Sequence, residues 1–179
     1  FGPSYSKDKE KECIPYALTS ETKVNPLLPA REIARLIMED LKNAEESLTG
    51  YDPVIETGAV WGDDPEGGVN DMRYRSMRLN YYAVQALMAR VALYCGEKDV
   101  AWEYAEKMIR GIHEEHKWFP FVTREEVVTT DKEDRIFQSE ILFGLYNLKR
   151  KESVYEVGFG ANLKQGSVLR IDKDIMQNI

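Results

Sequence analysis

Apolar residues recur with the period of an α-helix in the first third of the chain. Those on the shared face are Ile33, Leu36, Ile37, Leu41, Ala44 and Leu48. Charged residues occupy the other face, so the pattern predicts an amphipathic helix over residues 29–49. Pro29 suits its first turn, because the N–H that proline lacks has no helical partner there, and Gly50 suits its end. Residues 1–28 lack this period and predict an extended, loop-like lead-in.

A second and a third helical stretch follow one another closely. The apolar positions of the second are Leu79, Tyr82, Ala83, Ala86, Leu87, Val91 and Tyr94, and those of the third run from Val100 to Ile112. Gly96 stands between them and is a natural helix stop, because glycine adopts the left-handed conformation without a Cβ penalty. So short a turn requires antiparallel packing, and residues 74–112 therefore predict a helical hairpin.

The remaining segments carry weaker patterns. Residues 50–73 contain repeated glycine and proline and predict a long loop, a kind of segment that often has a function. Residues 113–179 predict a second loop-rich region. Within it, residues 140–147 (EILFGLYN) indicate a buried strand or extended segment, with a helical turn as the alternative. The chain is therefore expected to form one mainly α domain over residues 1–179, with long loops and one short extended segment.

Charge and cysteine content narrow the possible partners. The formal net charge of −7 argues against nucleic acid, whose binding proteins present a basic face, and is compatible with a neutral ligand. The sequence has no run of about eighteen apolar residues, which a membrane-spanning helix would need. Cys95 ends an apolar helical run and is expected to be a small packed hydrophobe and not a disulfide partner of Cys13.

Motifs of catalysis and metal binding are missing from the sequence. It holds no nucleophile elbow, phosphate-binding glycine loop or Cys/His metal cluster. His113 and His116 are three residues apart at a helix end, which favours a solvated terminus over the H-E-x-x-H zinc arrangement. We therefore expect no enzyme activity, no metal and no cofactor. The carboxylate pair of a glycoside hydrolase is defined by a distance in space, so that class stays open as an alternative.

The hairpin has the small-residue spacing of a tetratricopeptide unit at Ala89, Gly96 and Ala101. The match is incomplete, because Ala92 replaces the usual aromatic residue and His113 replaces the closing proline. A single unit is visible, whereas a freestanding repeat array needs about three to bury a continuous core. By itself the hairpin therefore indicates a helical repeat and no more.

In its surroundings the hairpin resembles the SusD/RagB family. Residues 80–109 (NYYAVQALMARVALYCGEKDVAWEYAEKMI) are similar to the most recognisable helix pair of that family. Residues 14–48 (IPYALTSETKVNPLLPAREIARLIMEDLKNAEESL) resemble its proline-containing lead-in and preceding helix, and residues 139–146 (SEILFGLY) resemble its E-I-(I/L)-F strand. Residues 1–3 (FGP) resemble the end of a stretch that follows an earlier helix. These segments occur in the order that the family has.

The resemblance implies a SusD-like fold on a tetratricopeptide-like hairpin, in part of a longer chain. It also implies non-catalytic capture of oligosaccharides or another nutrient at the bacterial cell surface. It further implies delivery of the ligand to a SusC-like TonB-dependent transporter. The same resemblance implies a lipid anchor in the outer membrane, outside this sequence. The alternative from another class is a tetratricopeptide-type scaffold for protein–protein interaction.

Sugar binding needs flat aromatic faces with polar groups beside them. Trp61, in the glycine-rich loop, is either an exposed stacking platform or packs over the helices. Tyr155 and Phe159 follow the 140–147 segment, where the resemblance implies a sugar-contacting aromatic residue. Other aromatic residues are expected to pack in the core or between helices: Tyr81, Tyr82, Tyr94, Tyr104, Trp118, Phe119 and Phe121. Glycan-binding candidates are therefore Trp61, Tyr155 and Phe159.

Overall fold

A computed structural model shows 54% of the described residues in helices and few strands, which confirms the mainly α class. The structure describes residues 5–60, 66–68, 73–116, 118–128, 136–145, 149 and 156–158. Two compact units divide the chain, Phe1–Gly144 and Leu145–Ile179. The short helix α6 (Glu156–Gly158) belongs to the second unit, and every other element belongs to the first. None of the described helices has the length and apolar character that crossing a bilayer requires.

The lead-in contains a small antiparallel sheet that the sequence did not predict. Strand β1 (Glu12–Pro15) pairs with β2 (Leu27–Pro29), with Ile14 opposite Leu28. Eleven residues separate the strands without a tight-turn signature, so their pairing is non-local and leaves little trace in the sequence. The Cys13 thiol donates to the carbonyl of Leu28 at 3.5 Å, and Cys13 and Cys95 are both free.

Helix α1 (Ala30–Leu48) confirms the first predicted helix within one residue at each end. It follows Pro29, and its inner face buries Ile33 and Leu41. The outer face is charged, with Arg35 bound to Glu32 at 2.7 Å. Such exposed ion pairs contribute little to stability, so the apolar face accounts for the position of the helix.

Helix α3 (Tyr81–Cys95) begins seven residues later than the pattern predicts. Asn80 is its N-cap, with the side-chain oxygen accepting from the Ala83 N–H at 3.0 Å. Before it lies the 3-10 helix η1 (Arg75–Met77), and Tyr74 is left-handed at φ 55°, which interrupts any continuous helix. A good cap thus overrides apolar spacing.

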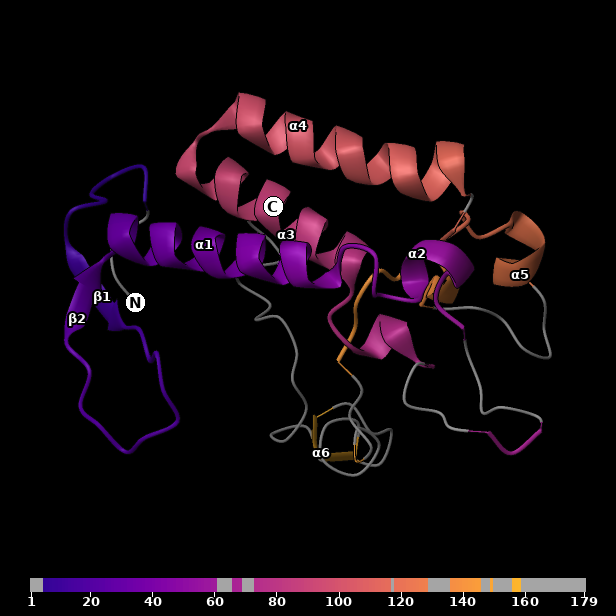
Figure 1. Ribbon diagram of the computed structural model, residues 1–179, viewed down its shortest axis with the longest axis horizontal. Coiled ribbons are helices and arrows are strands. Elements are labelled where there is room, and N and C mark those ends of the chain that lie inside the picture. The colour runs from indigo at the N-terminus through magenta and orange to yellow at the C-terminus, as the bar shows by residue number, and fades with distance from the viewer. Residues whose placement is uncertain are drawn as a thin grey trace, which may run out of the picture. The chain divides into compact units, whose positions relative to one another are not determined.

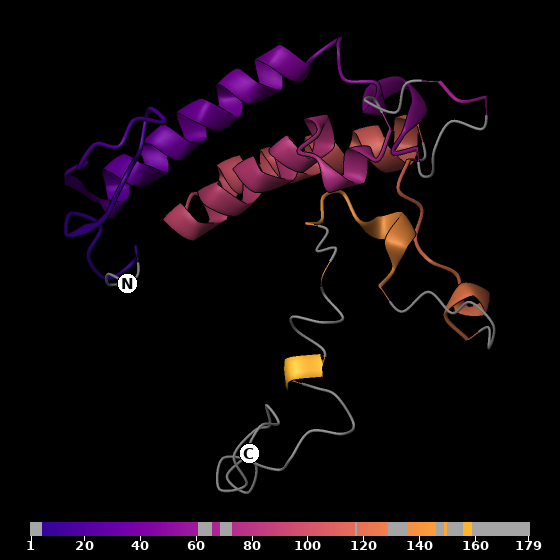
Figure 2. The same cartoon turned by 90° about the horizontal axis from the view of Figure 1, so that it is seen from below.

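Helix α4 (Lys98–Ile109) packs antiparallel against α3, which confirms the predicted hairpin. Gly96 supplies the expected left-handed turn at φ 83°. Helix α1 lies along α3 in both views (Figures 1 and 2). After α4 the chain continues through a wide helical turn, η2 (Arg110–Glu115). There Gly111 faces Tyr82 so closely that a Cβ would lie 2.9 Å from the tyrosine ring.

The two faces of α3 bury different clusters. One cluster consists of Val54, Tyr82, Ile112 and Phe119, with Trp118 packed against it. The other consists of Leu41, Val84 and Met88. Each fully buried side chain of this size contributes roughly 1.5–3 kcal/mol. Helix α3 is therefore the central element of the first unit.

Some aromatic predictions are wrong. Trp118, Phe119 and Tyr82 pack in the core as expected. Phe121 is 72% exposed, because it lies past the edge of the cluster and stacks on His113 at 4.8 Å. Tyr94 is 59% exposed, because it turns outward in the last turn of α3, where Tyr5 lies at 5.6 Å.

The segment 140–147 is not a buried strand. It begins at the end of η3 (Gln138–Glu140) and continues as irregular chain to residue 145, with residues 146 and 147 outside the described part. Among the described residues, no strand pairs with it. It is held instead by the Gly144 N–H, which donates to the carbonyl of Ser76 at 2.7 Å. The predicted loops also contain two short helices, α2 (Val54–Thr57) and α5 (Arg124–Val128).

Replacement of Gly111 by alanine tests the close contact with Tyr82. Because the tyrosine is buried and cannot easily move, Gly111→Ala should lower the free energy of unfolding by about 1–3 kcal/mol, measured by urea denaturation. The exposed neighbour Arg110→Ala is the control and should change it by less than about 1 kcal/mol. An alanine variant as stable as the wild type would show that the contact is not tight, since alanine also favours the helix.

Candidate functional site

A groove of about 470 Å³ lies between the turn after α1 and one end of the α3–α4 hairpin. We call it the hairpin groove. Its lining side chains that can contact a ligand are Tyr81, Tyr82, Gln85, Glu103, Glu106, Lys107, Arg110, Glu115 and His116. They combine aromatic surface with hydrogen-bond donors and acceptors, a composition typical of small-molecule sites.

One carboxylate joins three helices directly beside the groove, and we call this junction the floor of the groove. Glu45 of α1 accepts at Oε1 from Gln85 Nε2 of α3 at 2.8 Å and from Lys107 Nζ of α4 at 2.7 Å. Gln85 is 1% exposed, whereas the Lys107 side chain is 53% exposed. The carboxylate therefore fixes a rigid amide below and holds a mobile ammonium above.

Both members of the Glu45–Lys107 pair remain ionised near neutral pH. Burial disfavours the charged form of Glu45, but the hydrogen bonds from Lys107 and Gln85 outweigh it and lower the pKa of the carboxyl. Burial also works against the Lys107 ammonium, and the bond to Glu45 outweighs it and raises the pKa of that group. The floor of the groove is thus a stable ion pair.

Tyr81 supplies the half-buried aromatic surface of the groove. Its ring and that of Tyr82 form a T-shaped pair with a centroid distance of 5.4 Å and an angle of 74°. Lys107 Nζ lies over the Tyr81 ring, 6.0 Å from its centroid. Burial raises the pKa of the neighbouring Tyr82 to about 12, so that hydroxyl remains neutral. The Tyr81 ring thus presents a face that already attracts positive charge.

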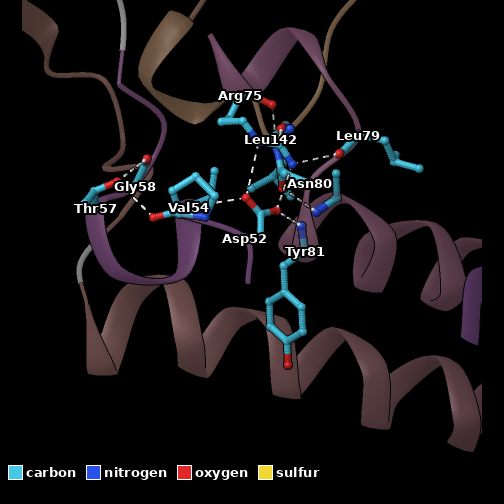
Figure 3. Close-up of polar contacts among 11 residues, drawn as sticks. Asp52, Val54, Thr57, Gly58, Arg75, Leu79, Asn80, Tyr81 and Leu142 are labelled. Atoms are coloured by element: carbon cyan, nitrogen blue, oxygen red, sulfur yellow. Dashed lines mark hydrogen bonds and ion pairs between the residues drawn. The ribbon is translucent and has the colours of Figure 1, made fainter. Parts of the chain in front are cut away.

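A buried aspartate positions Tyr81 (Figure 3). The side chain of Asp52 is 0% exposed, and its Oδ2 accepts from the Tyr81 N–H at 2.8 Å. Its Oδ1 accepts from the Val54 N–H and from Arg75 Nε, both at 3.2 Å, and Arg75 Nη2 pairs with Oδ2 at 3.1 Å. The ring of Tyr81 points away from this carboxylate toward α4 (Figure 3). The network therefore anchors the backbone from which the ring extends.

Asn80 adds a second anchor at the same helix end. Its Nδ2 donates to the carbonyls of Arg75 at 3.0 Å and Leu142 at 2.7 Å, while its oxygen caps α3. All the polar atoms of this buried amide are thus used within one short region. Asn80 thus connects the start of α3 to the irregular segment after η3, beside the Gly144–Ser76 bond.

The three sequence-predicted glycan contacts do not form part of the described site. Trp61, Tyr155 and Phe159 lie outside the residues that the structure describes. The hairpin groove was missed, because Tyr81 was assigned to packing together with Tyr82. One signal could have revealed it: Gln85 follows Tyr81 by four residues and so shares its helix face, which is therefore not purely apolar.

The two histidines stack on aromatic rings. His113 lies against Phe121, and His116 lies 5.9 Å from Trp118 with the rings nearly parallel. Within the described part of the chain, no group of three or more histidine, cysteine or acidic side chains could hold a metal ion. Of the two, His116 lines the hairpin groove.

The Asp52–Arg75 pair can be tested by a double-mutant cycle. Asp52→Asn leaves a largely buried guanidinium without its carboxylate, so the free energy of unfolding should fall by about 3 kcal/mol in urea denaturation. Adding Arg75→Met removes the unpaired charge and should recover part of this loss. Strictly additive effects of the two substitutions would contradict the pairing.

The lowered pKa of Glu45 predicts a pH dependence of stability. Because the folded-state pKa lies below its ordinary value of 4.5, the stabilisation is complete above that value and is lost as pH falls through the folded-state pKa. The stability advantage of the wild type over Glu45→Gln should therefore shrink between about pH 5 and pH 3. Urea denaturation across this range measures it. Glu46→Gln, at the exposed next position, should follow the wild type throughout.

No protein-family model, curated protein or solved structure matches this chain. The geometry of the hairpin groove and the sequence resemblance are therefore the grounds on which a function is proposed.

Proposed function

We propose that this protein binds oligosaccharides without transforming them, and that the hairpin groove is a binding surface. The observation that carries this proposal is the half-buried ring of Tyr81 set among hydrogen-bonding side chains of α4. A sugar ring has an apolar C–H face bordered by hydroxyl groups. An aromatic ring flanked by donors and acceptors complements both of these features.

The contact between Lys107 and Tyr81 supports this choice of ligand. The ammonium lies over the ring because the aromatic face carries partial negative charge. The C–H groups of a sugar carry partial positive charge and fit the same face. A sugar ring would take the place of the Lys107 ammonium, whose flexible side chain can move into solvent.

The polar wall of the groove supplies both kinds of hydrogen bond. Glu106 accepts from Arg110 at 3.3 Å, and both side chains are about half exposed. Their planar carboxylate and guanidinium groups can each contact two neighbouring hydroxyls. The wall therefore fits a ligand with many closely spaced hydroxyl groups.

The state of Glu45 favours capture over turnover. A glycoside hydrolase needs a carboxylic acid with a raised pKa as its proton donor. Hydrogen bonding in the hairpin groove has the opposite effect on the pKa of Glu45. Glu45 is therefore held ionised and is not the proton donor that a hydrolase would need.

The sequence resemblance to the SusD/RagB family extends the proposal to a cellular role. Under this extended proposal, the α3–α4 hairpin is a tetratricopeptide-like unit of a SusD-like scaffold. The protein would capture oligosaccharides at the bacterial cell surface, held at the outer membrane by a lipid anchor. It would pass them to a SusC-like TonB-dependent transporter.

A second groove favours the alternative of a protein-interaction scaffold. It has a volume of about 360 Å³ and lies among β1, α1 and α3, with a mostly apolar lining that includes Ile14, Ile33, Val91 and Tyr94. We call it the apolar groove. Tyr94 and Ile14 are substantially exposed there, and exposed apolar surface of this kind marks interaction sites. An apolar peptide segment would be the ligand under this hypothesis.

Two matched tyrosine substitutions on α3 separate the hypotheses. The wild type should bind at least one oligosaccharide in a glycan array, with the affinity then measured by calorimetry. Tyr81→Ala should weaken that binding about tenfold, because stacking on an aromatic ring contributes on the order of 1 kcal/mol. Tyr94→Ala should leave it unchanged, because that ring lies in the apolar groove.

Other results would point elsewhere. Absence of binding to any glycan, together with binding of an apolar peptide that Tyr94→Ala abolishes, would favour the interaction scaffold. Release of shortened sugars during incubation would instead indicate a hydrolase.

A further inference from the structure

One polar atom at the floor of the hairpin groove has no hydrogen-bond partner. Among the described residues, no donor reaches Oε1 of Gln85. The residue is almost fully buried and lines the groove from α3. A buried acceptor without a donor is costly in a folded protein and calls for an explanation.

The orientation of the Gln85 amide is fixed by its neighbour. Nε2 faces the Glu45 carboxylate, which is ionised and can only accept hydrogen bonds. Rotating the amide by half a turn would place two oxygens against each other. Oε1 is therefore the end of the amide that is left for another donor.

The charges around this acceptor disfavour negatively charged ligands. The carboxylates of Glu103, Glu106 and Glu115 line the groove together with the cations Lys107 and Arg110. The carboxylate of Glu45 adjoins this lining through its bond to Lys107. Four negative and two positive groups leave a net charge of −2, in a chain whose net charge is −7. A ligand carrying carboxylate or sulfate groups would be repelled.

Access to the acceptor depends on a movable side chain. Gln85 Oε1 has almost no exposed surface, so a ligand reaches it only after a neighbour moves. Lys107 is flexible and half exposed, and it donates to the same Glu45 oxygen as Gln85 does. Its displacement would open the floor of the groove, and it is also the group that covers the Tyr81 ring.

We propose that Gln85 is the specificity-determining acceptor of the hairpin groove, and that it receives a hydroxyl group of a neutral oligosaccharide after Lys107 moves aside. The groove discriminates against acidic sugars. This inference rests on the proposed function of glycan binding and adds the class of sugar and the residue that selects it.

Replacing Gln85 with methionine tests the acceptor. Cellohexaose, xylohexaose and mannohexaose are titrated in a calorimeter into the wild-type chain and into Gln85→Met. Loss of one buried hydrogen bond should weaken binding of the preferred neutral hexasaccharide about three- to tenfold. The urea midpoint should change little, because the variant removes the unpartnered oxygen but also the Nε2 bond to Glu45. The same replacement at Gln138, which is exposed and outside the groove, should leave the affinity unchanged.

An acidic sugar tests the charge argument. Hexagalacturonate should bind the wild type at least about tenfold more weakly than the preferred neutral sugar at low salt. Glu103→Lys should strengthen its binding, and added salt should remove that gain. Equal affinities of the wild type for the neutral and the acidic sugar would overturn the proposed selectivity.

The outcomes distinguish a failure of glycan capture from a failure of the role proposed for Gln85. Failure of the wild type to bind any of the four sugars, or a wider glycan array, would overturn glycan capture itself. Binding of a neutral sugar that Gln85→Met leaves unaltered would retain capture and overturn the role of Gln85.

Discussion

The buried carboxylate of Asp52 holds together the end of the first unit where the groove forms. It accepts hydrogen bonds from the backbone of α2 and of α3 and pairs with Arg75 of η1. Three short-range structures thus meet at one charge that is removed from water. A buried charge is tolerated only when its partners compensate for lost hydration, so these elements cannot separate without exposing or stranding it. The backbone of Tyr81, and with it the aromatic surface of the groove, follows from this constraint (Figure 3).

Beside the groove, Glu45 is a second carboxylate that joins several elements, but its partners differ from those of Asp52. At Asp52 every partner is rigid, whereas at Glu45 one partner is a buried amide and the other is an exposed lysine. The lysine is the exposed partner of this pair, so its ammonium can exchange the carboxylate for water while Glu45 keeps the bond from Gln85. A ligand can therefore displace Lys107 while Gln85 and Glu45 remain in place. This combination of a fixed floor and a movable cover is what a reversible binding site needs.

The α3–α4 hairpin is then both scaffold and site. The middle of the hairpin buries apolar side chains against α1 and serves as scaffold. At the end joined to η2, however, two consecutive tyrosines line the groove, Tyr82 almost fully buried and Tyr81 half-buried. Glycan capture uses the second of these, while a peptide-binding scaffold would use the apolar groove near the other end of α3. The two hypotheses thus assign function to different surfaces of one helix.

Local sequence predicted what local physics controls. Helical spacing, Pro29 and Gly96 specify α1 and the hairpin turn, because their effects act within a few residues. Prediction failed where distant residues combine: the β1–β2 pairing spans a long connection, and residues 140–145 have no partner strand among the described residues. It also gave apolar spacing more weight than the Asn80 cap, a local signal that sets the start of α3. The predicted contacts Trp61, Tyr155 and Phe159 lie outside the described residues, so their roles stay predictions. Glu45, Gln85 and Lys107 meet only because three helices pack together, and tertiary structure alone decided that the chain has this groove.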